Sequence, residues 1–195
     1  MGKVLAISGS SRDKTTNYML RKVLEAFNDE YQKEIIFLKD KNIQPCRNCK
    51  SCHKTFKCAI ADDMTEIYEK LIEADVILLG SPTYFDNVSG IMKNFMDRCL
   101  PFYFSGELAG RKAGLVSVGG FKELVESDKK GNCLWCKETG GCEKTVERCL
   151  NSMEYFCNLL GMKVVGKMAA IHGSPELKDR ELLNLGKKLL DTSHD

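Results

Sequence analysis

The sequence predicts an α/β protein, a three-layer sandwich in which helices cover both faces of a five-stranded parallel sheet. The first observation is that short apolar runs alternate with amphipathic segments along the 195 residues. The second is that residues 4–7 and 76–79 are apolar throughout, as in strands buried on both faces. The third is an ordinary globular composition, with 43% hydrophobic and 29% charged residues. This length is sufficient for one domain with a real core.

Five runs are the expected strands, and a segment with helical periodicity follows each of them in the chain. The strands are expected at residues 4–7, 34–38, 76–79, 113–118 and 162–171. The helices are expected near residues 17–27, 64–74, 89–98, 144–160 and 175–190. The second helix carries one apolar face, made by Met64, Ile67, Tyr68, Leu71 and Ile72. Asp62 and Asp63 precede this helix and are interpreted as caps, not as a catalytic pair.

No linker, internal repeat or low-complexity segment interrupts this pattern. Residues 1–195 are therefore expected to form a single domain. Two Cys-rich segments are added to it, a loop at residues 45–58 after the second strand and an insertion at about residues 121–142.

The first strand runs into a turn rich in hydroxyl groups, residues 8–17, and then into a helix. Backbone N–H groups and the positive end of a helix dipole face such a turn, so it is suited to bind a phosphate. Arg12 adds a charged donor. The turn has neither G-x-G-x-x-G nor a Walker pattern, which disfavours a dinucleotide or a nucleoside triphosphate. The alternative is a polar loop before a helix capped by Thr15 or Thr16.

Two further segments are expected at the same edge of the sheet, because ligands bind outside the carboxyl ends of parallel strands. Residues 80–90 follow the third strand and offer the flat rings of Tyr84 and Phe85 to a planar ligand. Gly119 and Gly120 follow the fourth strand, where the backbone can approach a ligand closely. The alternative for Tyr84 and Phe85 is packing against the next helix.

Four cysteines in the loop at residues 45–58 have the spacing C-x2-C-x2-C-x5-C: Cys46, Cys49, Cys52 and Cys58. Cysteines at gaps of two residues are typical of iron–sulfur ligands. Four thiolates also suit zinc, although zinc sites usually consist of two separated Cys pairs. Free or disulfide-bonded thiols are a third interpretation. His53 lies inside this loop and is interpreted as a solvated residue.

A second C-x2-C-x5-C run comprises Cys133, Cys136 and Cys142 and has no obvious fourth ligand. It is a candidate metal site that uses Cys149, or a redox pair at Cys133 and Cys136. Cys149 and Cys157 fall at helical spacing with apolar neighbours and are interpreted as core residues. Cys99 is expected to be buried and His172 to be structural.

The formal net charge of +2 gives no electrostatic reason to expect nucleic acid or an acidic membrane as a partner. No apolar run has the length of a signal-peptide core or a membrane span. Ten cysteines without an export signal indicate the reducing cytoplasm, where thiols bind metals or do redox work.

Taken together, several motifs resemble those of the flavodoxin-like NAD(P)H-dependent FMN reductase superfamily, and within it the iron–sulfur flavoproteins. The motifs are Gly9-Ser10-Ser11-Arg12 with Thr16-Asn17, the four-Cys loop, Asp62-Asp63-Met64, Ser81-Pro82-Thr83-Tyr84-Phe85 with Ser89-Gly90, Asp97-Arg98 and Gly119-Gly120. The resemblance covers nearly the whole chain. It departs after Gly119-Gly120, where relatives have a short glycine-rich connection and this chain has the Cys-rich insertion.

The resemblance implies the strand order 2-1-3-4-5, with FMN at the carboxyl edge. It implies that the FMN phosphate is held by Ser10, Arg12, Thr15, Thr16 and Asn17. It implies that the isoalloxazine ring is lined by Pro82, Thr83, Tyr84, Phe85 and Asn87 and covered by Gly119 and Gly120. It also implies that Cys46, Cys49, Cys52 and Cys58 ligate a [4Fe–4S] cluster, in a homodimer or homotetramer.

The function expected from these parts is an FMN-dependent oxidoreductase. Electrons would pass from a ferredoxin-type or NAD(P)H donor, by way of the cluster and FMN, to a small acceptor such as oxygen, peroxide or a quinone. No catalytic acid–base residue is identified. The alternatives are a flavodoxin-like electron carrier, a plain FMN reductase whose Cys loop holds zinc or nothing, and a zinc-type interaction module without flavin.

Overall fold

The computed structural model describes residues 1–120, 141–171 and 175–191. In these ranges the parallel strands are β1 (Gly2–Ser8), β2 (Tyr31–Phe37), β3 (Val76–Tyr84), β5 (Lys112–Gly119) and β6 (Lys163–Ile171). Their order across the sheet is β2-β1-β3-β5-β6. This is the predicted order 2-1-3-4-5, because β5 and β6 are the fourth and fifth parallel strands.

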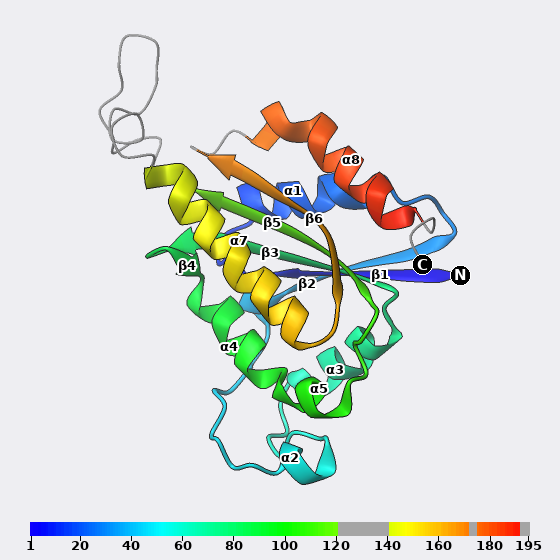
Figure 1. Cartoon of the computed structure of the whole chain (residues 1–195), viewed down its shortest axis with the longest axis vertical. Coiled ribbons are helices and arrows are strands. Elements are labelled where there is room, and N and C mark those ends of the chain that lie inside the picture. Colours follow the sequence, from blue (N-terminus) through cyan, green and yellow to red (C-terminus); the bar gives the residue numbers. More distant parts are fainter. Residues whose placement is uncertain (121–140, 172–174, 192–195) are drawn as a thin grey trace.

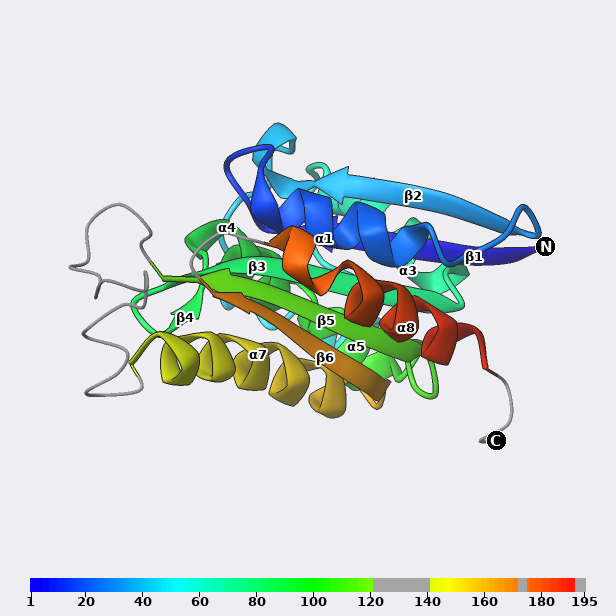
Figure 2. The same cartoon turned by 90° about the horizontal axis from the view of Figure 1, so that it is seen from above.

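Helices cover both faces of the sheet, as Figures 1 and 2 show. One face carries α1 (Thr15–Leu24) and α8 (Asp179–Leu190), and the other carries α3 (Met64–Glu73), α4 (Gly90–Arg98) and α7 (Gly141–Leu159). Four shorter elements lie between them: η1 (Leu38–Asp40), α2 (Cys52–Thr55), α5 (Leu100–Ser105) and η2 (Pro175–Lys178). None of the helices in the described ranges combines the length and apolarity needed to cross a bilayer.

The two faces of the central strands explain why those strands are continuously apolar. Leu5 and Ile7 of β1 are buried with the residues of α3, α4 and α7. Val4 and Ala6 alternate with them and are buried with α1 and α8. Successive side chains of a strand point to opposite faces, so a strand covered on both sides needs an apolar residue at every position.

The third strand is longer than the sequence predicts. Residues 80–84 were expected to be loop, yet β3 pairs with β5 as far as Pro82 and continues to Tyr84. It then turns back through Phe85 and Asp86, both with positive φ, into the two-residue strand β4 (Asn87–Val88). A two-residue turn with positive φ at both positions is the preferred connection of a tight hairpin.

Candidate functional site

The carboxyl ends of β1, β3 and β5 meet at one edge, where hydrogen bonds join the predicted ligand loops. The Gly9 amide donates to the Gly80 carbonyl at 2.8 Å, and the Ser89 hydroxyl donates to the Gly9 carbonyl at 2.6 Å. The hydroxyls of Thr83 and Ser117 are 3.1 Å apart, which joins β3 to β5. The three segments therefore lie together, as the sequence predicts.

The turn before α1 is shaped by its own side chains. The Ser10 hydroxyl donates to the Arg12 carbonyl at 2.7 Å and accepts from the Arg12 amide at 3.2 Å. Buried Asn17 donates to Asp13 at 2.9 Å and accepts from the Ser8 hydroxyl. Hydrogen bonds from Arg21 and Asn17 lower the pKa of Asp13. Ser10 and Asn17 thus organise the turn, and they are not displayed on its surface.

The helix after this turn lacks a side-chain cap. Its N-cap residue is Lys14, which makes no capping hydrogen bond, so the alternative of a cap at Thr15 or Thr16 is wrong. Thr16 is buried and Thr15 is half-buried, whereas Arg12 is exposed. The first-turn N–H groups of a helix without a cap need partners from outside it. This favours the predicted anion site over the plain polar loop.

The hairpin of β3 and β4 presents its aromatic residues to solvent. Phe85 is fully exposed and Tyr84 is 42% exposed, so the alternative that both pack against the next helix is wrong. Pro82 is buried and Thr83 is half-buried beneath them. Asp86 forms an exposed ion pair with Arg148, which links the hairpin to α7.

The remaining predicted ring residues differ in how they are fixed. Asn87 is exposed and accepts a hydrogen bond from the Val88 amide at 2.8 Å. Gly119 is buried, and a Cβ atom there would lie 2.5 Å from Cγ2 of Val146. Gly120 is exposed with φ of 86°, a conformation that favours glycine.

A buried hydroxyl network under this edge was not identified from the sequence. The Ser117 hydroxyl donates to the Ser81 carbonyl at 3.0 Å, and the Ser89 amide donates to the Ser81 hydroxyl at 3.0 Å. The Cys149 thiol lies 3.9 Å from the Pro82 carbonyl. Burial raises the pKa of Cys149, against hydrogen bonds from neighbouring hydroxyls that lower it. The signal in the sequence that could have indicated this network was the presence of polar residues within otherwise apolar strands.

The cysteine loop brings its four thiols to one pocket. Cys46, Cys49, Cys52 and Cys58 all line it, together with Arg98 of α4. Cys46 and Cys49 are exposed, Cys58 is half-buried, and Cys52 is buried in α2. Burial raises the pKa of Cys52, and charge on the other three thiols adds to the rise. In the described ranges, however, no group of three His, Cys, Asp or Glu side chains is arranged to hold a metal ion.

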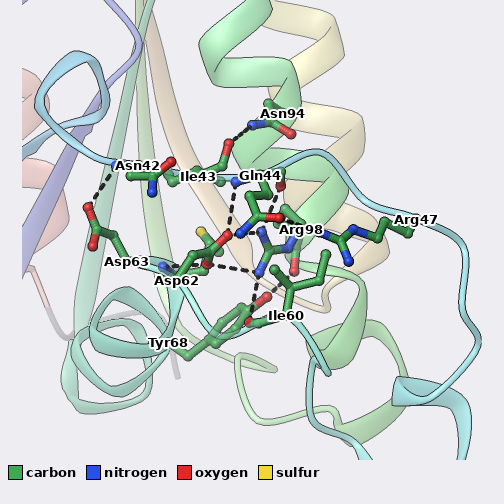
Figure 3. Close-up of polar contacts among 11 residues, drawn as sticks. Asn42, Ile43, Gln44, Arg47, Ile60, Asp62, Asp63, Tyr68, Asn94 and Arg98 are labelled. Atoms are coloured by element: carbon green, nitrogen blue, oxygen red, sulfur yellow. Dashed lines mark hydrogen bonds and ion pairs between the residues drawn. The ribbon is translucent and has the colours of Figure 1, made fainter.

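Both ends of the cysteine loop are attached to Arg98, as Figure 3 shows. One terminal nitrogen donates to the Gln44 carbonyl at 2.7 Å, and the other lies 3.4 Å from the Ile60 carbonyl. The guanidinium also pairs with Asp62 at 2.5 and 3.0 Å, and both side chains are buried. Burial opposes ionisation of Asp62, yet hydrogen bonds from Arg98 and two backbone amides lower its pKa.

The capping interpretation of the acidic pair is therefore incomplete. Asp62 does accept the Met64 amide at 3.0 Å at the start of α3. Its second role, the ion pair with Arg98, was missed, because a charged residue in the last turn of a helix is usually exposed. Asp63 makes no capping bond to its helix and instead accepts the Asn42 amide at 2.7 Å.

The residues of the loop fit a soft metal centre in two respects. Four thiols are the donor set that iron–sulfur clusters and structural zinc prefer. In addition, Nε of Arg98 is the one buried side-chain nitrogen or oxygen in the described ranges without a hydrogen-bond partner. A buried unpaired donor is costly, and a thiolate or sulfide in the pocket would be an acceptor for it.

Three of the other cysteines are buried, as the sequence predicts. Cys99, Cys149 and Cys157 are buried, and burial raises the pKa of Cys157 to about 12. Cys142 is buried within α7. Cys133, Cys136 and His172 lie outside the described residues. His53 is exposed, as expected, and its ring lies 4.4 Å from the ring of Phe104.

The sequence matches the family model described as NADPH-dependent FMN reductase over residues 2–128. It is 43% identical over 119 residues to an iron–sulfur flavoprotein of Methanocaldococcus jannaschii, covering 60% of this chain and 62% of that protein. An iron–sulfur flavoprotein of Archaeoglobus fulgidus is 43% identical over 97 residues, 49% of this chain and 48% of that one. The matched segments thus span between about half and three fifths of these relatives.

A more distant relative is matched over more of its length. An iron–sulfur flavoprotein of Methanosarcina thermophila is 29% identical over 167 residues, 84% of this chain and 77% of that protein. Among solved structures, an NAD(P)H:quinone oxidoreductase of Methanothermobacter marburgensis superposes with a TM-score of 0.71 at 15% identity, covering 99% and 98% of the two chains. The flavodoxin of Megasphaera elsdenii superposes with a TM-score of 0.57 at 16% identity, covering 95% and 97%. These neighbours establish the flavodoxin-like fold.

Proposed function

The chain belongs to the NADPH-dependent FMN reductase family, and from this premise we propose that it is an FMN-dependent oxidoreductase with a [4Fe–4S] cluster. The observation that supports the cluster is the pocket lined by all four loop cysteines. Iron–sulfur flavoproteins among the relatives support the same assignment. Residues 1–195 would act as one FMN-binding domain, in a cytoplasmic homodimer or homotetramer.

The flavin would lie across the carboxyl edge of the sheet. Its phosphate would meet the uncapped start of α1 and the charge of Arg12. The set proposed to surround the phosphate is Ser10, Arg12, Thr15, Thr16 and Asn17, and the set proposed for the ring is Pro82, Thr83, Tyr84, Phe85, Asn87, Gly119 and Gly120. Exposure of Tyr84 and Phe85 supports this, because a free aromatic surface is available to a planar ligand. When bound, FMN supplies hydride and single-electron chemistry.

The cluster would be held by Cys46, Cys49, Cys52 and Cys58. The loop between them contains no acidic residue, and its basic residues are exposed: Arg47, Lys50, Lys54 and Lys57. These charges offset those of four thiolates and attract an acidic surface. This supports a ferredoxin-type donor. NAD(P)H is the other proposed donor, and the acceptor is a small molecule such as oxygen, peroxide or a quinone.

One observation favours a second candidate, a plain FMN reductase without a cluster. The four thiols share a pocket, yet in the described ranges they do not form a group arranged to hold a metal. Ligand loops often close only around their metal, and for this reason we prefer the cluster.

The test is an absorbance spectrum of protein purified without oxygen, with flavin, iron, sulfide and zinc assayed on the same sample. A flavin band, a broad shoulder near ~400 nm and about four irons per chain are expected for one cluster. Flavin without iron would select the plain reductase. Protein that neither retains FMN nor rebinds it would refute the assignment of the carboxyl edge.

A further inference from the structure

We propose that Arg98 is the positioning residue of the cysteine loop, holding both of its ends and thereby setting the spacing of the four thiols. The proposal rests on the function above only in treating these thiols as the metal ligands. Arg98 is not a ligand itself, and no side-chain periodicity marks it. We infer this role from the contacts of its buried guanidinium group.

The entry to the loop is held at three consecutive residues, Asn42, Ile43 and Gln44. Asp63 accepts the Asn42 amide at 2.7 Å, and the Asn94 side chain donates to the Ile43 carbonyl at 2.7 Å. At Gln44 the peptide is held on both sides, since its amide donates to Asp62 at 2.9 Å and its carbonyl accepts from Arg98 at 2.7 Å. Figure 3 shows the two Gln44 contacts at the ion pair of Arg98 and Asp62, and the other two contacts beside it.

The exit from the loop is held by the same guanidinium. Its second terminal nitrogen lies 3.4 Å from the carbonyl of Ile60, two residues after Cys58. Gln44 is two residues before Cys46. The planar fork of arginine can reach two carbonyls and a carboxylate at once, which the single ammonium of lysine cannot do. Arg98 therefore joins residues 44 and 60 and keeps the two ends of the loop together. We call this pair of contacts the clasp.

The side chain also contributes a fixed charge to the thiol pocket. Arg98 is 1% exposed and lines the pocket with the four cysteines. Asp62 compensates the charge, and Nε remains without a partner in the described ranges. A buried donor without a partner beside four sulfurs is available to an acceptor that enters the pocket.

The test uses apo protein and Co²⁺, whose thiolate complexes absorb strongly and report the ligand geometry. Arg98→Met removes the clasp and the charge, and Arg98→Lys keeps only the charge. Arg98→Met combined with Asp62→Asn removes the buried carboxylate that a single substitution would leave unpaired, in case Arg98→Met alone does not fold. The matched control is Leu185→Ala, which weakens the core on the opposite face of the sheet. Circular dichroism checks that every variant is folded.

We expect every Arg98 variant to bind Co²⁺ at least tenfold more weakly than the wild type. The Co²⁺ affinity of Arg98→Lys should exceed that of Arg98→Met by no more than threefold. Leu185→Ala should remain within twofold of the wild type. Folded Arg98→Met, or the folded double variant, with wild-type affinity would overturn the proposal. Equal loss in Leu185→Ala would overturn it too, because the effect would then be one of general stability.

A second measurement does not depend on metal binding. Cys52 is buried, so its reaction with a thiol reagent should be slow in apo wild type and at least tenfold faster in the Arg98 variants. Unchanged labelling of Cys52 would refute the clasp. If labelling accelerates but neither iron nor Co²⁺ binds the wild type, the clasp stands and the proposed cluster fails.

Discussion

Substituting Gly119 by Ala tests how tightly the proposed flavin edge is built. A Cβ atom at this position would lie 2.5 Å from Cγ2 of Val146 and 3.3 Å from Cβ and Oγ1 of Thr83. The first distance is far inside van der Waals contact, so the Val146 side chain, α7 or the end of β5 must shift. Thr83 belongs to the proposed ring site, so the displacement should also reach the ligand.

The expected cost follows from overpacking of a dense core. Forcing one extra carbon into such a site typically costs about 1–3 kcal/mol. For a chain of this size, 1 kcal/mol corresponds to roughly 2–4 °C, so the melting temperature should fall by about 2–12 °C. FMN binding should weaken in parallel, because Thr83 is pushed from its hydrogen bond with Ser117.

The assay is thermal unfolding of the apo protein by circular dichroism, followed by titration with FMN and flavin fluorescence. Gly90→Ala is the matched control, because a Cβ there meets nothing within 4 Å at the start of α4. It should be neutral or slightly stabilising. Adding Val146→Ala to Gly119→Ala should restore part of the loss. Wild-type stability of Gly119→Ala, or no relief from Val146→Ala, would refute the reasoning.

Three further predictions concern single contacts. Cys49→Ser should lose iron and the cluster absorbance while keeping FMN, as measured by metal analysis and spectroscopy on protein purified without oxygen. Ser89→Ala loses the α4 cap and the hydrogen bond to the Gly9 carbonyl, so urea unfolding should show a loss of about 1–2 kcal/mol. The ion pair of Asp62 with Arg98 stabilises the fold when Asp62 is ionised. This stabilisation is fully present above the pKa of Asp62 in the unfolded chain, about 4. It is lost as the pH falls through the lower pKa that Asp62 has in the folded chain. Asp62→Asn should therefore flatten the loss of stability below about pH 4 in urea titrations.

Each of these has an outcome that would contradict it. Full iron content in Cys49→Ser would remove that residue from the ligand set, and Cys157→Ala should keep its iron as the control. Ser89→Ala as stable as the wild type would show that water replaces its hydroxyl. An acid dependence identical in wild type and Asp62→Asn would mean that other carboxylates dominate below pH 4.

The fold was predictable because its signals are local. Apolar runs mark the central strands, and helical periodicity marks α3, α4 and α7. The extension of β3 was not predictable from such signals. Gly80, Ser81 and Pro82 are typical turn residues, and only the pairing of Pro82 with Val118 on the neighbouring strand reveals that the strand continues. Tertiary pairing overrides local preference here.

The candidate site was predictable where one segment contains it. The four loop cysteines stand out by their spacing, and the turn at residues 8–17 by its hydroxyl groups between a strand and a helix, so both could be proposed as sites from the sequence. Arg98 was noted only as part of the Asp97-Arg98 motif. Its contacts were not predicted, because its partners Gln44, Ile60 and Asp62 come from remote positions and converge only in the folded chain. The hydroxyl network of Ser81, Ser89 and Ser117 was not predicted either, because these residues also come together only in the folded chain.

The shared anchor of Gln44 and Ile60 has an evolutionary consequence. A segment that leaves and rejoins a fold at one point can change length without shifting the strands on either side. The entropic cost of closing such a loop depends only weakly on its length. Residues 45–59 are such a segment, since their two ends meet at Arg98. A lineage could therefore gain, lose or exchange a metal-binding cassette at this point by a single insertion or deletion. The proposed flavin edge, built from other segments, would be inherited unchanged.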